Sequence, residues 1–352
     1  MRVWNADWQK FLVCLRVFAS SRALGFMNFF VRSSSGRSFV CLLLVPAALL
    51  AVNIVQKNPP VRPPDADSAV AIWDIDLNRA KDLPRNFRTT DDPFKPAKGE
   101  TPATTGLSDL RASGSGEFAP EGLKLVLART RGAVTVFDLR QETHMFVNGL
   151  PVSWYASRDW ANVGRSQSAI EADEAARVQL LKPGTEIGIR PGEAVKKGNA
   201  GSATLQRVTV ASAGTERDVV SDAGAGYVRI AVTDHARPLD DEVDHFVLAV
   251  RALPENAWAH FHCEAGRGRT TTFMVLYDML RNANRVSLED IVQRQKILGY
   301  DYEVLQPSEP RDWRVPYTED RIAFVRAFYN YARANPNGRP QLWSEWLKSN
   351  AQ

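Results

Sequence analysis

Apolar residues in the second half of the chain recur with the spacing of an amphipathic helix. From Val243 to Leu253 they fall three or four residues apart, which predicts one buried helical face over residues 240–253, capped by Asp240. Similar patterns predict five further helices, over residues 120–129, 270–282, 288–298, 319–335 and 342–348. Helices of this kind need a common core to cover.

Short apolar runs predict strands to provide that core. Residues 133–139 (AVTVFDL) and 258–262 (WAHFH) are apolar or β-branched and short enough to be buried strands. Residues 167–233 differ, because an acidic helical piece precedes short β-like runs that glycine and asparagine interrupt. We therefore expect an α/β fold with a central sheet flanked by helices and a small β-rich insert at about residues 167–233.

Two stretches lack apolar periodicity. Residues 57–71 are rich in proline and aspartate and predict an extended linker. Residues 95–116 are rich in glycine, serine, threonine and proline and predict a long surface loop. The main folded domain is expected to span residues 72–350.

The N-terminal segment, residues 1–56, has a basic head followed by an apolar run at residues 38–55. This order is typical of an export signal or a membrane anchor, and it predicts a periplasmic or extracellular protein. Residues 38–55 lack a clean A-x-A cleavage site and are long enough to stay as an anchor. A buried core helix is the other interpretation, and Met27 is a candidate alternative start.

The charge gives little information about partners. The net charge of +4 arises in residues 1–56, since the remaining 296 residues hold 38 basic and 39 acidic side chains. A nearly neutral body does not predict a nucleic-acid partner, and membrane contact is expected only through the N-terminal segment.

The cysteines and histidines argue against metal sites and disulfides. Cys14 and Cys41 lie in the N-terminal segment, so Cys263 is the only cysteine of the body. One thiol cannot form an internal disulfide or a cysteine-based zinc site, and the five histidines show no H-E-x-x-H pattern. We expect neither a metal nor a cofactor.

Residues 262–272 (HCEAGRGRTTT) carry the clearest chemical signal. Cys263 precedes Arg269 by six residues, with Gly266 and Gly268 between them, after a predicted strand and before a predicted helix. Glycines let successive backbone N–H groups turn toward one anion, and the helix N-terminus adds its positive end. This arrangement predicts a phosphate-binding loop. A lone buried cysteine with an arginine nearby by chance is the other reading, but it needs no glycines.

Within this loop the residue types suit phosphoryl transfer through a cysteine. The local positive field favours the Cys263 thiolate, a nucleophile, while Arg269 can bind two phosphate oxygens and Thr270 can donate a hydrogen bond to the sulfur. The expected phosphate contacts within the loop are Glu264, Ala265, Gly266, Arg267 and Gly268, and His262 is expected to be structural.

A departing alkoxide needs a proton, so a carboxylic acid should lie nearby. Asp234 is the candidate, because it follows a predicted strand and precedes the helix at residues 240–253. A turn or helix-capping role is the other reading of Asp234. Its neighbour His235 could contact a substrate phosphate or only shape the loop.

The loop resembles the signature of the protein tyrosine phosphatase-like inositol polyphosphate phosphatases, the bacterial cysteine phytases. The similarity covers about residues 82–350. Further motifs that resemble those of the family are N-F-R at residues 86–88, D-L-R-Q-E at 138–142, V-S-W-Y at 152–155, D-W-A-N at 159–162, T-D-H at 233–235 and W-S-E-W-L-K at 343–348.

The resemblance implies a tyrosine-phosphatase-like α/β fold. It also implies stepwise removal of phosphates from myo-inositol hexakisphosphate through a phosphocysteine, with a small-molecule polyphosphate as the partner. The cations expected to bind substrate are Arg88, Arg140, Arg267, Arg269 and Arg314, although Arg88 or Arg140 could instead be ordinary surface or salt-bridge residues. Two of these depart from the family: Arg267 adds a charge at a variable position, and Arg314 replaces lysine, which binds phosphate differently.

Other functions share these motifs. A phosphatase acting on phosphotyrosine or phosphoinositides would use the same Cys263, Arg269 and Asp234. A non-catalytic polyphosphate-binding protein would not need all three. A secreted effector, with an N-terminal segment that is not an export signal, is a further hypothesis.

Overall fold

A computed structural model of the chain describes residues 55–199 and 203–350. The predicted leader, residues 1–56, and its apolar run therefore lie almost entirely outside the described residues. Among the helices that are described, none combines the length and the apolar character needed to cross a bilayer.

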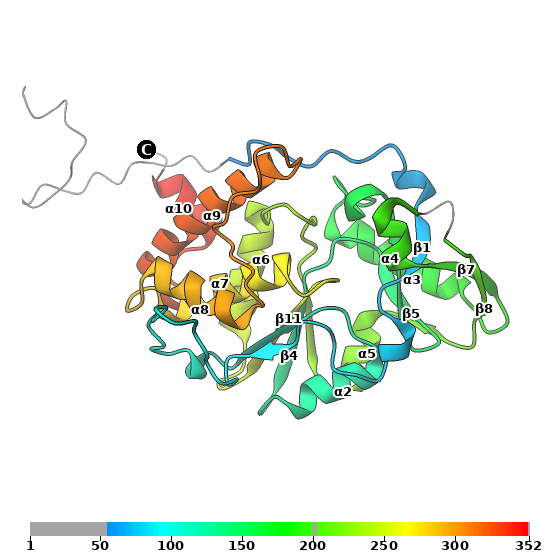
Figure 1. Cartoon of the computed structure of the whole chain (residues 1–352), viewed down its shortest axis with the longest axis horizontal. Helices are drawn as coiled ribbons and strands as arrows, with labels where there is room; N and C mark the ends of the chain where they lie inside the picture. Colours follow the sequence, from blue (N-terminus) through cyan, green and yellow to red (C-terminus); the bar gives the residue numbers. More distant parts are fainter. Residues whose placement is uncertain (1–54, 200–202, 351–352) are drawn as a thin grey trace, which may run out of the picture. The chain divides into compact units, whose positions relative to one another are not determined.

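Among the described residues, the central sheet has five strands in the order β10-β4-β11-β3-β2. Its strands β4 and β11 are labelled in Figure 1 and pair with each other. The bounds of the five strands are β2 Arg88–Thr89, β3 Ala112–Ser115, β4 Val134–Asp138, β10 Gly226–Arg229 and β11 Trp258–His262. Four strands are parallel, and only β2 runs antiparallel to its neighbour β3. The carboxyl ends of the parallel strands therefore share one edge, where the loops that follow them meet.

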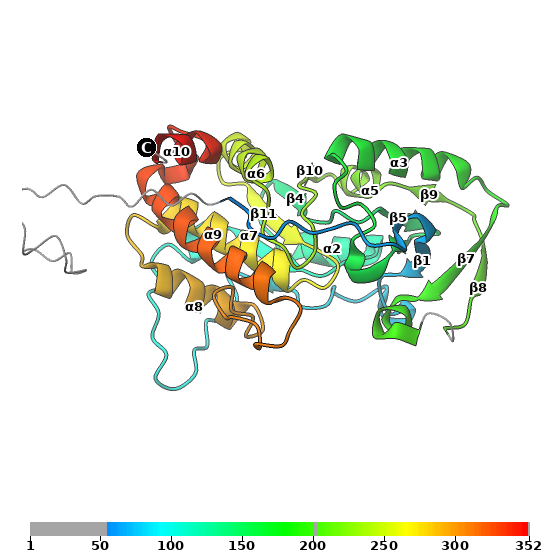
Figure 2. The same cartoon turned by 90° about the horizontal axis from the view of Figure 1, so that it is seen from above.

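Helices cover both faces of this sheet (Figures 1 and 2). Phe137 of β4 packs in the larger core with α6 Asp240–Ala252, α7 Gly268–Asn282, α8 Leu288–Leu298, α9 Val315–Ala334 and α10 Trp343–Asn350. Val136, the preceding residue, packs in a separate core with α2 Pro120–Ala128 and α5 Glu216–Asp222. Successive strand residues point to opposite faces, so one short strand contributes to both cores.

A second sheet has six strands in the order β8-β7-β1-β6-β5-β9. Their bounds are β1 Val70–Trp73, β5 His144–Val147, β6 Leu150–Tyr155, β7 Glu186–Pro191, β8 Gln206–Thr209 and β9 Ala213–Gly214. Helix α3 Gln167–Leu180 packs against β5, and α4 Gly192–Ala194 continues into a helical turn, Val195–Asn199. The remaining helical turns are Ala66–Ser68, Leu77–Arg79, Ser108–Leu110, Ser157–Asp159 and Pro336–Gly338.

The second sheet corrects the predicted bounds of the β-rich insert. Within the described part of residues 167–233, strands β7, β8 and β9 belong to this sheet, whereas β10 belongs to the central sheet. The three other strands come from residues 70–73 and 144–155, because β1 pairs with β6 and with β7 across long stretches of sequence. Because these paired strands are far apart in the sequence, no local sequence pattern indicates that they belong to one sheet.

The two polar stretches also differ from prediction. Residues 57–71 are not a free linker, because the Asn58 N–H donates to Asp320, the Arg62 side chain donates to the Ala161 carbonyl, and β1 starts at Val70. Residues 95–116 include β3, a buried strand of the central sheet. The helix predictions are confirmed to within a few residues, although Asp240 is the first residue of α6 and Leu239 its N-cap.

Candidate active site

The loop that joins β11 to α7 surrounds the sulfur of Cys263. The Gly266 N–H donates to Cys263 Sγ over 3.3 Å, and the Thr270 hydroxyl donates to it over 3.2 Å. Cys263 is only 2% exposed, but these donors make the surroundings of its sulfur polar. Because α7 begins at Gly268, its N-terminal end adds positive potential. These groups are placed to stabilise negative charge that develops near Sγ.

Side chains outside the loop hold its carbonyls turned outward. The Glu264 carbonyl accepts a hydrogen bond from Arg85, the Ala265 carbonyl from Asn86 and the Gly266 carbonyl from Arg88, over 3.0, 2.8 and 2.6 Å. When successive carbonyls point outward, the N–H groups between them are free to point toward a common centre, as in an anion-binding nest. The N-F-R motif therefore braces the phosphate loop.

Gly266 cannot be replaced without moving the backbone. Its φ is +72°, and an added Cβ would lie 2.2 Å from the Gly116 nitrogen and 2.4 Å from the Ser115 carbonyl carbon. We expect Gly266→Ala to lower kcat/KM by about 100-fold or more, because the loop must shift around Cys263. Steady-state kinetics on p-nitrophenyl phosphate would measure this. Gly164→Ala, at a positive φ with open space around it, is the matched control.

Arg269 is fixed from behind by Glu142. Its Nη1 and Nη2 donate to the two Glu142 carboxylate oxygens over 2.7 and 2.8 Å, and Nη1 also contacts the Leu139 and Val232 carbonyls. Its Nε lies 3.1 Å from Asp234 Oδ1 but makes no hydrogen bond. The Nε edge of the guanidinium therefore faces Asp234 in a fixed orientation, and an oxyanion could bind this edge only by displacing the Asp234 carboxylate.

Asp234 lies beside this edge, on the loop that follows β10. The Trp160 indole donates to the Asp234 carbonyl over 2.9 Å, and Asp234 Oδ2 lies 3.1 Å from His235 Nε2. Burial lowers the pKa of His235 although Asp234 opposes that shift, so His235 is neutral at pH 7 and can donate to Asp234. The structure thus brings the predicted acid next to Arg269.

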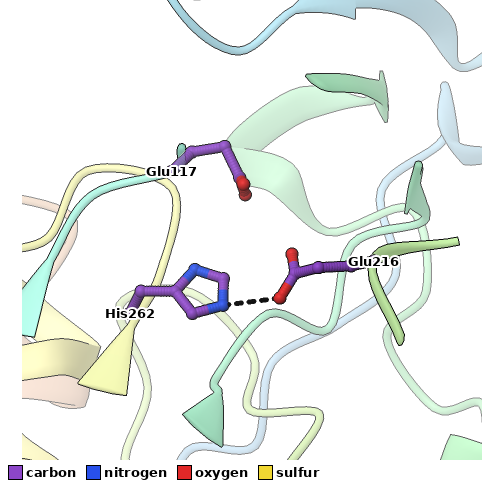
Figure 3. Close-up of side chains that lie close together, drawn as sticks. All are labelled: Glu117, Glu216 and His262. Atoms are coloured by element: carbon purple, nitrogen blue, oxygen red, sulfur yellow. Dashed lines mark hydrogen bonds and ion pairs between the residues drawn. The ribbon is translucent and has the colours of Figure 1, made fainter. Parts of the chain in front are cut away.

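His262, the residue before Cys263, is buried and paired with Glu216 (Figure 3). His262 Nε2 lies 2.7 Å from Glu216 Oε1, and although burial opposes the charge, Glu216 raises the pKa of His262 to about 9. Burial, together with the charge of Glu216, raises the pKa of Glu117 to about 7. Glu117, Glu216 and His262 are close enough to share a metal ion, and binding one would require His262 to release the proton that Glu216 favours.

The Glu216 and His262 pair should make stability depend on pH. The pKa of a histidine is near 6.5 in the unfolded chain, whereas that of His262 in the folded protein is about 9. The contribution of the pair to the free energy of unfolding is therefore complete below about pH 6.5 and is lost as the pH rises through 9. We expect Glu216→Gln to lower the free energy of unfolding by roughly 3 kcal/mol at pH 6 and by less at pH 9. Urea unfolding at both values would test this, with Glu121→Gln at an exposed pair as control.

Arg88 and Arg140, which were predicted either to bind substrate or to be ordinary surface or salt-bridge residues, both have buried side chains that are engaged by protein groups. Arg88 holds the Gly266 carbonyl and Thr271. Arg140 is fully buried and ion-paired with three carboxylates, those of Asp74, Glu117 and Glu142. Arg140 contacts Glu142, which in turn holds Arg269, so Arg140 supports the position of the Arg269 guanidinium through a buried ion-pair network.

The other predicted contacts have mixed environments. Arg267 is exposed, whereas the exposed Arg314 is paired with Asp312. The Glu264 carboxylate is paired with Arg85 over 2.5 Å and with Lys196 over 2.7 Å. Although burial opposes a charge on Glu264, Lys196 and Arg85 lower its pKa to about 2. Glu264 is therefore an anion within a salt-bridge network, unsuited to contact a phosphate through its side chain. Ala265 is half-buried, and Gly268 opens α7.

Sequence reasoning assigned no role to several residues of the site. Glu142 belongs to the D-L-R-Q-E motif, but nothing in that motif indicates that it contacts Arg269. Lys196 contacts Asp159 over 2.8 Å as well as Glu264, and it comes from a segment without a pattern. Burial raises the pKa of Asp159 to about 7. A cavity of about 820 Å³ adjoins this network and is lined by Lys196, Glu264 and Ala265 among others.

Comparisons with known proteins find PTP-like phytases similar to this chain in sequence and in structure. A family model for PTP-like phytases, described as inositol hexakisphosphate, matches residues 137–281. The structure of a PTP-like phytase from Bdellovibrio bacteriovorus is 40% identical, with a TM-score of 0.67 over 84% of this chain and 100% of that chain. The PTP-like myo-inositol phosphatase from Mitsuokella multacida, solved with myo-inositol-(1,3,4,5)-tetrakisphosphate, is 34% identical, with a TM-score of 0.71 over 83% of this chain and 50% of that chain.

A curated relative is larger than the region of similarity. Effector protein hopD2 from Pseudomonas syringae pv. tomato is 40% identical over 265 residues, which are 74% of this chain and 56% of that protein. The similarity to hopD2 thus leaves nearly half of that protein unmatched, whereas the Bdellovibrio phytase is matched along its whole length. On these matches and on the geometry around Cys263, the chain belongs to the PTP-like phytase family.

Proposed function

We propose that this protein hydrolyses phosphomonoesters of myo-inositol polyphosphates through a phosphocysteine intermediate on Cys263. The observation that carries the proposal is the convergence of three groups around one loop: the hydrogen-bonded Sγ of Cys263, the guanidinium of Arg269 and the carboxyl group of Asp234. The family description supports the substrate class, as does the inositol tetrakisphosphate bound to the Mitsuokella relative.

In the first step the Cys263 thiolate attacks phosphorus. The S–P bond forms as the bond from phosphorus to the ester oxygen breaks, and protonated Asp234 gives its proton to the departing alkoxide. Loop N–H groups and Arg269 stabilise the equatorial oxygens. A bound phosphate takes the Nε edge of Arg269 from Asp234, which frees the acid to face the leaving oxygen.

In the second step water hydrolyses the phosphocysteine. Asp234, now a carboxylate, accepts a proton from the attacking water, the new P–O bond forms, and the S–P bond breaks. The thiolate that leaves is stabilised by the Thr270 hydroxyl and the Gly266 N–H, both within hydrogen-bond distance of Sγ. Inorganic phosphate is released, and Asp234 is again protonated for the next cycle.

A substrate panel tests the proposed function. Rates should be measured on myo-inositol hexakisphosphate, a phosphotyrosine peptide and p-nitrophenyl phosphate at one pH and ionic strength. We expect kcat/KM for the inositol polyphosphate to exceed that for the peptide by at least about 10-fold, since several phosphates can meet several cations. A preference for the peptide would favour the phosphotyrosine phosphatase hypothesis, and no turnover on any of the three would favour a binding protein.

We also propose that residues 1–56 direct export, a prediction that falls outside the described residues apart from Val55 and Gln56. Support comes from their basic and apolar order. The hopD2 relative is described as an effector protein, which favours secretion by another route as the second hypothesis. Fusing residues 1–56 to a reporter that is active only in the periplasm separates these routes, because an export signal should activate it.

A further inference from the structure

Two consecutive residues near the site, Arg158 and Asp159, have an unusual backbone. Both have left-handed conformations, with φ of +66° and +62°. Outside glycine this costs roughly 1 kcal/mol or more for each residue, and such strain persists where surrounding contacts fix it. Asp159 is fixed by its contact with Lys196, over 2.8 Å. The neighbouring Arg158 has different partners, the rings of Trp160 and Trp313.

Arg158 is held by aromatic rings. Its guanidinium carbon lies 4.2 Å from the ring centroid of Trp313 and 5.0 Å from that of Trp160. Trp313 is 40% exposed, and no carboxylate among the described residues lies within salt-bridge distance of Arg158. By contrast, the predicted substrate contact Arg314 is paired with Asp312. Arg158 is therefore an exposed cation. The aromatic rings fix the orientation of its side chain but do not neutralise its charge.

The same rings contact the general-acid loop. The Trp313 ring packs edge-on against His235, with centroids 5.1 Å apart, and the Trp160 indole donates to the Asp234 carbonyl. Asp234 in turn lies 3.1 Å from Arg269. A short series of contacts thus links Arg158 to the position of the reacting phosphate.

We propose that Arg158 binds a phosphate of the substrate other than the one transferred, with Trp313 as the platform that holds it. A guanidinium held over an indole by a cation–π contact can still donate its N–H groups to two phosphate oxygens, and its rotamers are already restricted. The inference rests on the proposed function, because only a substrate with several phosphates can use a second cation. It makes Arg158 a specificity-determining residue.

The test compares two substrates in one enzyme. We expect Arg158→Ala to lower kcat/KM for myo-inositol hexakisphosphate about 10- to 50-fold, mostly through KM, and to change kcat/KM for p-nitrophenyl phosphate less than about 3-fold. Arg158→Lys should restore part of the loss, and Trp313→Leu should give a smaller loss that is not additive with Arg158→Ala. Arg207→Ala, at an exposed arginine of β8, is the matched control.

The outcomes are distinguishable. Equal losses on both substrates would mean that Arg158 only positions the general-acid loop, and no loss on either would mean that it does not contact substrate; both results overturn the inference. A wild-type protein that hydrolyses p-nitrophenyl phosphate but not inositol hexakisphosphate would instead overturn the proposed function, whatever Arg158 does. Thermal unfolding midpoints of the variants would show that losses are not due to misfolding.

Discussion

Replacing Cys263 with serine is expected to lower kcat by at least about 10⁴-fold while inositol polyphosphate binding is retained. The hydroxyl of serine does not ionise at neutral pH, so the loop N–H groups, the α7 N-terminus and Arg269 have no thiolate to stabilise. The phosphate loop itself is unchanged, because its carbonyls are held by residues 85–88. Rapid-quench and steady-state assays would measure turnover, and titration calorimetry would measure binding.

The control for this variant is Cys41→Ser, which removes a thiol that the sequence places outside the folded domain. Full turnover in Cys263→Ser would contradict the nucleophile assignment. Loss of both turnover and binding, with an unchanged unfolding midpoint, would show that the sulfur is needed to shape the loop, and the retained-binding prediction would then be wrong.

The catalytic loop could be predicted from sequence because its determinants are contiguous. Residues 258–262 are a short apolar run, and β11 has those bounds. Gly266 and Gly268 mark the turn, and the hydroxyl of Thr270 contacts Cys263 as expected. Asp234 was predictable from its place after a strand and before a helix. In each case a local pattern carried the information.

Strand β3 shows where local pattern fails. Its residues 112–115 (ASGS) are small and polar and read as loop, yet they are buried beside β11. Ser113 accepts a hydrogen bond from Trp258 and contacts His260, both on the neighbouring strand. Small side chains also leave room for α7, since an added Cβ on Gly114 would lie 2.6 Å from Met274. Tertiary contacts therefore override the weak strand propensity of this segment.

The buried charges show the same limit at the site. Arg140 looks like a substrate cation in the sequence, but its partner Asp74 lies 66 residues earlier, directly after β1 of the second sheet. A charge of this kind is tolerated in the interior only because several carboxylates surround it. Since those partners come from separate segments, the sequence shows the charge and not its burial.

Replacing Asp234 with asparagine is expected to lower kcat by about 10²- to 10⁴-fold on inositol polyphosphates, whose alkoxide leaving groups need a proton. On p-nitrophenyl phosphate the first step needs little acid assistance, because nitrophenolate is a good leaving group. Hydrolysis of the phosphocysteine still lacks its base. The variant should therefore release about one equivalent of nitrophenol per enzyme in a rapid burst and then turn over slowly.

Stopped-flow absorbance would resolve the burst and the slow phase. Asp222→Asn, at an exposed aspartate at the end of α5, is the matched control and should keep wild-type kinetics. If Asp234→Asn slowed the burst on p-nitrophenyl phosphate as much as turnover of the inositol polyphosphate, Asp234 would be acting on loop geometry and not as a proton donor. A burst with unchanged rate followed by slow turnover is expected only if Asp234 acts as the acid in the first step and as the base in the second. The first step uses the protonated carboxyl group and the second uses the carboxylate, so the asparagine variant loses both functions, but only the second is needed for a good leaving group.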